Sequence, residues 1–189
     1  MGRGKKIVDI ELVIEEAVAL IEEGGVEEFS TRRLASRLGI SAMTLYNYYE
    51  NRGAILGEAL ARGLKLLWEG LPEKVAKWRA AGGKPLGSYK VLADHLLDFA
   101  IARPYLCRFV LTEGAGSDWT ARDSQIELIC GPGEGLAGGS TSTGQVRHDI
   151  YLFELLAFAL ALKVIVGGES AERFRELISE GYDRLLGQY

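Results

Sequence analysis

Apolar residues recur along most of this chain at spacings of three and four, which is the period of a helix that packs on one side. The first example is DIELVIEEAVALIEEGG (residues 9–25), in which glutamates occupy the face opposite the apolar residues. Gly24 and Gly25 are expected to end this helix. No run of alternating β-branched residues is long enough to indicate a sheet, so the pattern predicts an all-α protein.

Three more helices are predicted in the next fifty residues. FSTRRLASRLG (29–39) has Ser30 as a natural N-cap and closes at a glycine. A short helix capped by Ser41 is expected to run to about Tyr49, and a fourth helix to run from near Gly53 to Pro72. The connections are short, so these helices are expected to pack together.

The second half of the chain shows the same helical period, interrupted once. GPGEGLAGGSTSTG (131–144) is too rich in glycine, serine and threonine to be an element and is predicted to be a mobile loop. Two final helices are expected over about 146–166 and 170–187. Both carry broad apolar faces that require a partner.

One stretch, IYLFELLAFALALKVIVGG (150–168), is long and apolar enough to cross a membrane. Glu154 and Lys163 lie inside it, and each would cost about 2.5–3.5 kcal/mol near the bilayer centre. The stretch is therefore expected to be a helix buried on nearly every side, in the core or between subunits. No membrane partner is expected, and the cytoplasm is the predicted location.

Composition limits the possible chemistry. The chain has 189 residues, with 22 Lys and Arg against 26 Asp and Glu, for a formal charge of −4. This balance argues against a protein that coats nucleic acid unspecifically but allows local basic patches. Cys107 and Cys130 are expected to be reduced thiols, and with His95 and His148 as the only histidines no metal or other cofactor is expected.

Residues 30–52 have the pattern of a helix-turn-helix, two short helices joined by a tight turn that contains glycine. If Leu45 points inward, Tyr49 shares the core side at about 100° per residue. The opposite face then carries Met43, Thr44 and Asn47, flanked by Tyr46 and Tyr48. This face suits a major groove: Ala42 and Met43 offer apolar contacts to thymine methyls, and the hydroxyl and amide groups suit base edges and phosphates.

Charge along this segment favours the same interpretation. Arg32, Arg33, Arg37 and Arg52 are accompanied only by Glu50, whereas the acidic residues crowd into 9–28. A local basic surface is therefore compatible with the acidity of the whole chain. Core packing in an ordinary helical bundle remains the alternative for the tyrosines, and periodicity alone does not decide between the two.

The segment FSTRRLASRLGISAMTLYNYYENRGAIL closely resembles the DNA-binding region of the TetR family of bacterial transcriptional repressors. The shared positions are Thr31, Leu34, Ala35, Leu38, Gly39, Ile40, Ser41, Thr44, Leu45, Tyr46, Tyr48, Tyr49 and Arg52. The resemblance covers roughly the first third of the chain. It implies a three-helix DNA-binding domain over 1–53 and a helical effector-binding and dimerisation domain over 54–189.

The resemblance also implies roles for individual residues. The expected DNA-binding residues are Thr31, Arg32, Ser41, Ala42, Met43, Thr44, Tyr46, Asn47, Tyr48 and Arg52. Met43 replaces a glycine and Tyr48 a histidine that are common in the family, so the DNA sequence read there cannot be copied from relatives. Candidate walls of an effector pocket are His95, Tyr105, Trp119, His148 and Tyr151, although most aromatics of this region are expected to be core.

The resemblance implies a cytoplasmic one-component regulator, usually a repressor, that binds a palindromic operator as a homodimer through its last two helices and responds to a small molecule. An enzyme is not expected. The G-x-G-x-x-G match at 133–138 lacks a following helix, and no G-x-S-x-G elbow exists. Two alternatives stay open: a small-molecule-binding or enzymatic helical protein with a vestigial helix-turn-helix, and a DNA-packaging protein without specificity.

Overall fold

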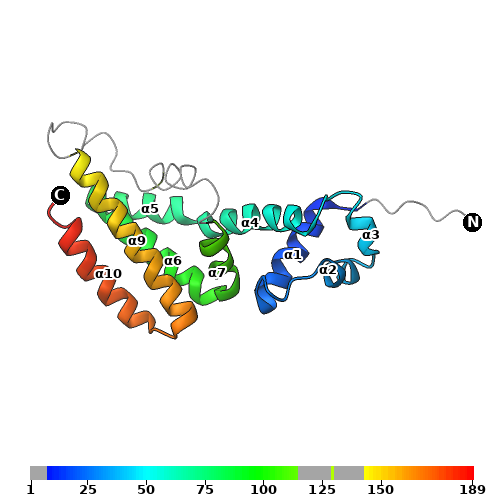
Figure 1. Cartoon of the computed structure of the whole chain (residues 1–189). Coiled ribbons are helices and arrows are strands. Elements are labelled where there is room, and N and C mark those ends of the chain that lie inside the picture. Colours follow the sequence, from blue (N-terminus) through cyan, green and yellow to red (C-terminus); the bar gives the residue numbers. More distant parts are fainter. Residues whose placement is uncertain (1–7, 115–128, 130–142) are drawn as a thin grey trace, which may run out of the picture.

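The computed structural model describes residues 8–114, 129 and 143–189, and within these ranges every regular element is helical (Figure 1). The helices are α1 (Ile10–Gly24), α2 (Thr31–Arg37), α3 (Ala42–Leu45), α4 (Arg52–Trp68), α5 (Leu71–Ala80), the 3₁₀ turn η1 (Pro85–Gly87), α6 (Ser88–Ala102), α7 (Pro104–Glu113), α9 (Thr143–Gly167) and α10 (Ala171–Leu185). The predicted all-α fold is confirmed. Residues 131–142 of the predicted loop lie outside the described ranges, whereas Thr143 and Gly144 already belong to α9.

Polar caps set the starts of the helices in the first third of the chain. Oδ1 of Asp9 accepts from the backbone N–H of Glu11 at 3.0 Å, and Oγ of Ser30 accepts from that of Arg33 at 3.2 Å. Such bonds satisfy donors that a first helical turn leaves unpaired. The predicted capping role of Ser30 is therefore confirmed, and Asp9 performs the same role for α1.

The predicted fourth helix is α4, which ends at Trp68 and not at the predicted Pro72. Gly70 adopts a left-handed backbone with φ +77° before Leu71 begins α5. Pro72 stands in the first turn of α5, where a missing N–H costs nothing. The sequence placed the break at Pro72, a few residues late, because the turn is made by Gly70 and the proline belongs to the next helix.

The molecule is elongated, with α1 to α3 at one end, here called the head, and α5 to α10 at the other, here called the body (Figure 1). α4 belongs to both, because it packs against α1 and against α7. In the body, α6 is central and contacts α5, α7, α9 and α10. The predicted domain division between residues 53 and 54 falls in the first turn of α4.

α9 is only partly covered in the single chain. Its segment Gly144–Gly167 is long and apolar enough to cross a membrane by composition, a weak criterion that core helices also meet. One face packs on α6 and α10 and buries Phe153 and Ala161. The other face exposes a run of apolar side chains: Tyr151, Leu152, Leu155 and Val166. A single chain therefore does not bury α9 on nearly every side.

Candidate nucleic-acid interface and effector groove

The burial pattern of residues 42–49 divides them into an inner and an outer face. Leu45 is fully buried and Tyr49 is 4% exposed, whereas Met43 is 73% exposed. Tyr46 and Tyr48 are each nearly half exposed, and Asn47 is exposed with them. The predicted separation of Tyr49 from the other two tyrosines is confirmed as a matter of burial.

α3 is shorter than the predicted helix to Tyr49. Oγ of Ser41 accepts from the N–H of Thr44 at 3.1 Å and lies 2.9 Å from its hydroxyl, which caps the helix. After Leu45 the backbone tightens into a turn, with the N–H of Tyr48 donating to the carbonyl of Leu45 at 2.9 Å. Asn47 and Tyr48 therefore project from a turn at the end of the helix.

Thr31 and Tyr46 are tied to each other. The side chain of Thr31 is 7% exposed, and its hydroxyl accepts from the phenol of Tyr46 at 3.4 Å. Two residues expected to face DNA thus form a contact that joins α2 to the end of α3. Arg32 and Ala42 stand next to them, the first exposed and the second partly buried.

The arginines of α2 do not form the basic surface that the sequence suggested. Arg33 lies 3.0 Å from Glu23, and Arg37 bonds both Glu16, at 2.8 Å, and the same Glu23. The bond from Arg37 lowers the pKa of Glu23 below its ordinary value. Acids from α1 thus neutralise two of the four arginines, because the helix crossing brings residues ten to twenty positions apart into contact.

Arg52 is also engaged within the chain. Its guanidinium donates to the carbonyl of Val26 at 2.8 Å and lies over the ring of Phe29, 5.5 Å from the centroid. It thereby fixes the connection between α1 and α2 to the start of α4. Among the described residues, Arg32 alone of these four arginines makes no ion pair or hydrogen bond.

The turn that follows α3 is bonded to α4 at its last residue, Tyr49. The phenol of Tyr49 donates to the carboxylate of Glu58 at 3.2 Å. Burial and this nearby carboxylate raise the pKa of Tyr49 to about 12, so the phenol keeps its proton at any ordinary pH. This bond links α4 to the residues just after α3.

A second row of ion pairs joins α1 and the loop after it to α4 and to the body. Glu15 pairs with Arg62 of α4 at 2.5 Å, Glu22 with Arg103 at 2.5 Å, and Glu27 with Arg108 of α7 at 2.7 Å. Each pair is partly exposed and so contributes little stability alone, about 0–1 kcal/mol. Together with the α2 pairs they explain why glutamates are concentrated in this part of an acidic chain.

The described members of the predicted effector-binding set lie on three different helices, α6, α7 and α9. Tyr105 is 43% exposed on α7, and its ring lies 6.0 Å from the guanidinium of Arg108, beside the head. His148 and Tyr151 lie on the exposed side of α9. Trp119 is outside the described residues. Among the four described residues, His95 lines a groove.

That groove, here called the α4–α6 groove, has a volume of about 280 Å³ and lies where α4, α5 and α6 meet. Its lining residues are Leu66, Glu69, Lys74, His95, Asp98, Phe99, Ala102 and Arg103. His95 is 8% exposed, and its Nε2 lies 2.7 Å from the carbonyl oxygen of Leu67 in α4. Burial lowers the pKa of His95 below its ordinary value, which favours the neutral ring.

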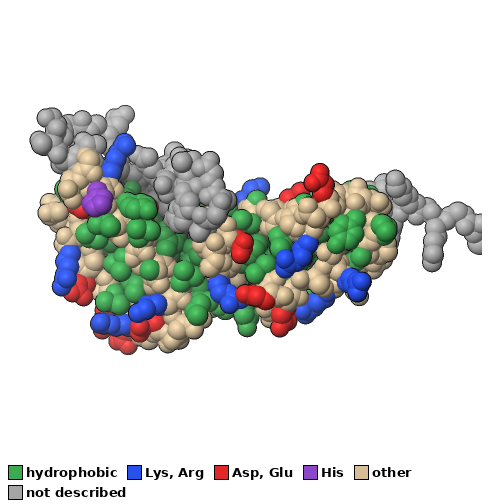
Figure 2. Space-filling view, in the orientation of Figure 1, with side chains coloured by type: hydrophobic (Ala, Val, Ile, Leu, Met, Phe, Trp, Pro, Cys, Tyr) green, Lys and Arg blue, Asp and Glu red, His purple; other side chains and the backbone are tan. Residues whose placement is uncertain are grey.

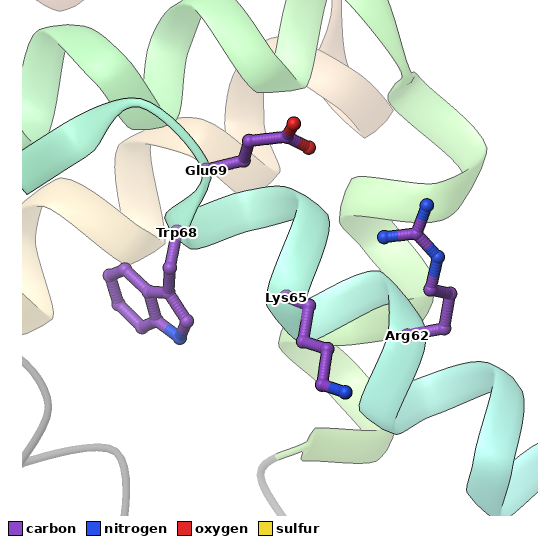
Figure 3. A pocket seen from close by; sticks show the side chains of 4 residues that line it. All are labelled: Arg62, Lys65, Trp68 and Glu69. Atoms are coloured by element: carbon purple, nitrogen blue, oxygen red, sulfur yellow. The ribbon is translucent and has the colours of Figure 1, made fainter.

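A second hollow of about 410 Å³ lies along the last turns of α4 (Figure 3). It is lined by Arg62, Lys65, Trp68 and Glu69, which recur at helical spacing. Figure 3 shows the side chains of Lys65 and Trp68 projecting from the same side of the helix. The sequence pattern gave no sign of it, because basic and aromatic residues on an exposed helix face are ordinary.

Within the first third of the chain, the amino-acid sequence is similar to that of known bacterial regulatory proteins. Residues 13–59 match the model of the bacterial regulatory proteins of the tetR family. The chain is 43% identical over 54 residues to the class C tetracycline repressor protein of Escherichia coli, which covers 29% of this chain and 24% of that protein. It is 45% identical over 51 residues to the class D protein of Escherichia coli, covering 27% and 23%. The chain thus spans about a quarter of the length of the curated relatives it matches.

Solved structures resemble the chain over nearly its whole length. A TetR-like transcriptional regulator from Rhodococcus sp. RHA1 superposes with a TM-score of 0.65 and 20% identity, covering 94% of this chain and 95% of that one. A TetR transcriptional regulator from the same organism gives a TM-score of 0.60 at 15% identity, covering 93% and 94%. At such identities the likeness concerns the fold of head and body together.

Proposed function

We propose that this chain, which belongs to the TetR family of bacterial regulatory proteins, is a one-component repressor that binds a palindromic operator as a homodimer and is controlled by a small-molecule effector. The observation that carries the proposal is the outer face of residues 42–48, where Met43, Tyr46 and Tyr48 are exposed on a capped helix and turn. Exposed aromatic and sulfur-containing side chains at this density are costly unless they have a partner.

In this proposal the head (1–53) reads DNA and the body (54–189) binds the effector and the second subunit. Ser41, Ala42, Met43, Thr44, Asn47 and Tyr48 approach the major groove, and Arg32 contacts phosphate. Thr31, Tyr46 and Arg52 hold the reading helix through the internal bonds described above, with any DNA contact as a second role. The protein acts in the cytoplasm and is not an enzyme.

Homodimer formation is supported by the exposed apolar face of α9. Figure 2 shows hydrophobic side chains spread over the part of the molecule where α9 lies in front. A second copy of α9 and α10, related by two-fold symmetry, would cover Leu152 and Leu155 in an isologous interface. The two reading helices would then lie about 34–36 Å apart, which matches successive major grooves.

The proposal is tested by sequencing the genomic fragments that the purified protein retains. A specific regulator should prefer its palindromic site to random duplex by about 10³-fold or more. Asn47→Ala should abolish this preference, whereas Gln188→Ala, which removes an exposed amide near the end of the chain, should leave it intact. Equal affinity for all fragments would contradict the proposal and favour a packaging protein.

A further inference from the structure

The α4–α6 groove contains two hydrogen-bond acceptors that have no partner among the described residues. One is Nδ1 of His95, a buried atom for which no donor lies within reach. The other is the carboxylate of Glu69, which makes no hydrogen bond or ion pair within the described chain. A buried acceptor without a donor is destabilising, so Nδ1 of His95 leaves the groove incomplete, whereas the carboxylate of Glu69 is exposed and hydrated.

The tautomer of His95 follows from its one bond. Nε2 lies 2.7 Å from the carbonyl oxygen of Leu67, and a carbonyl oxygen only accepts, so Nε2 carries the proton. Nδ1 of the neutral ring is then an acceptor. Any group that completes the site must therefore present an N–H or O–H donor, and the groove wall must open to admit it, because Nδ1 is sealed from solvent.

The cations of the groove are already paired. Lys74 lies 3.2 Å from Asp98, and Arg103 lies 2.5 Å from Glu22 of α1. The remaining formal charge on the groove wall is the negative charge of Glu69. The nearby Arg62 offsets it only in part, because that guanidinium is bonded to Glu15, although the charge of Glu69 also raises the pKa of Arg62. The groove consequently favours a cation over an anion.

Apolar side chains complete the wall. Leu66 of α4 and Phe99 and Ala102 of α6 line the same groove. The volume, about 280 Å³, is slightly below the range of drug-sized pockets. From these features we infer that the groove binds a small apolar amine in its protonated form, whose N–H groups donate to Nδ1 of His95 and to the carboxylate of Glu69.

The same contact provides a route to the head. A donor on Nδ1 polarises the imidazole and strengthens the bond from Nε2 to Leu67, because linked hydrogen bonds reinforce one another. The amine thus ties the end of α4 to α6, while the start of α4 holds Tyr49 through Glu58. This regulatory role rests on the proposed function, whereas binding of the amine does not.

The test uses benzylamine, a primary amine on an apolar ring, with benzoate as the anion of similar size and benzyl alcohol as the neutral donor. We expect calorimetry on the full chain to rank the affinities benzylamine, benzyl alcohol, benzoate. Glu69→Gln should weaken benzylamine about fivefold, the upper end of what an exposed ion pair contributes. Glu73→Gln, which removes an exposed carboxylate from α5 outside the groove, is the matched control.

Imidazole ¹⁵N NMR reports on the buried acceptor directly. The chain has two histidines, so His148→Gln leaves one ring to observe. Benzylamine should shift the Nδ1 resonance of His95 in the direction of a hydrogen-bonded acceptor, and Glu69→Gln should require more amine for the same shift. An unchanged Nδ1 resonance at saturation, or tighter binding of benzoate, would overturn the inference.

The two proposals fail separately. If the protein selects a palindrome but His95 does not respond to benzylamine, the amine site is wrong and the regulator stands. If His95 responds but no DNA fragment is selected, the site stands and the regulator is wrong. If both succeed, benzylamine should change operator affinity in the wild type and much less in Glu69→Gln, since the ligand must distinguish two states of the protein.

Discussion

Met43 and Leu45 are two positions apart and have opposite environments, so they separate stability from recognition. Leu45 is fully buried and Met43 is 73% exposed. Leu45→Ala should lower the free energy of unfolding by about 2–5 kcal/mol, because it leaves a cavity under α3. Met43→Ala should change it by less than about 0.5 kcal/mol while altering which bases the protein prefers. Urea unfolding and selection from random duplexes measure the two effects, and equal destabilisation would refute the face assignment.

His95 makes the free energy of unfolding depend on pH in a range above that in which carboxylates such as Glu23 titrate. Burial lowers its pKa in the folded chain, with Lys74 adding to the effect and Asp98 and the bond to Leu67 opposing it. The unfolded chain binds the proton more readily, so stability is full above the unfolded value of about 6.5 and declines as the pH falls below it. The pKa of Glu23 is also lowered, but its contribution is lost only near or below about 4.5.

Thermal or urea unfolding at fixed protein concentration between pH 7.5 and 5 measures this decline. His95→Gln keeps a donor for the Leu67 carbonyl but has no titrating ring, so its stability should vary much less over that interval. A wild-type chain equally stable at both ends of the interval would show that the ring gains its proton in the folded state.

Local chemistry was readable from the sequence, and long-range pairing was not. The caps at Ser30 and Ser41 and the burial of Tyr49 followed from helical period and from donors that need an acceptor nearby. The neutralisation of Arg37 by Glu16 and Glu23 did not, because it depends on how α2 crosses α1. Likewise, nothing in the period of α6 indicated that His95 would face Leu67.

At the scale of an element, α1 carries two rows of acids with different partners. Glu16 and Glu23 pair with arginines of α2, while Glu15 and Glu22 pair with Arg62 of α4 and Arg103 beyond α6. Each row has a spacing of seven, so its members lie on one side of the helix two turns apart. α1 is therefore the common support of the reading helix pair and of the body.

Glu23→Gln should release Arg33 and Arg37 from their shared carboxylate. Arg37 then keeps only Glu16, and Arg33 keeps only Glu28 at 3.6 Å. Because each guanidinium has one carboxylate fewer, we expect tighter binding to random duplex and a steeper salt dependence, by about 0.9 in the logarithmic slope for each phosphate gained. Glu15→Gln removes the same charge from the other row and should leave the slope nearly unchanged. Binding isotherms at several salt concentrations decide, and identical slopes for the two variants would show that the α2 arginines do not reach DNA.

At the scale of the whole molecule, α9 stands out because apolar side chains remain exposed along one of its faces. Leu152 and Leu155 are each more than a third exposed on a helix whose other face is in the core. The sequence predicted a helix buried on nearly every side, and one chain buries only part of it. A second copy of the chain would cover the apolar surface of α9 that one chain leaves exposed. Recognition of a palindrome also requires two copies related by two-fold symmetry.

Leu155→Glu tests this interface. Burying an unpaired charge costs about 3–5 kcal/mol, which should raise the dimer dissociation constant by about 100-fold or more. Ile101→Glu makes the same change at an exposed position of α6, outside the seam, and should leave the dimer intact. Sedimentation velocity gives the mass, and operator binding gives the consequence: the Leu155 variant should retain its helix content yet lose most of its preference for a palindrome over a half-site. A Leu155 variant that stays dimeric while the Ile101 variant dissociates would move the interface to α6.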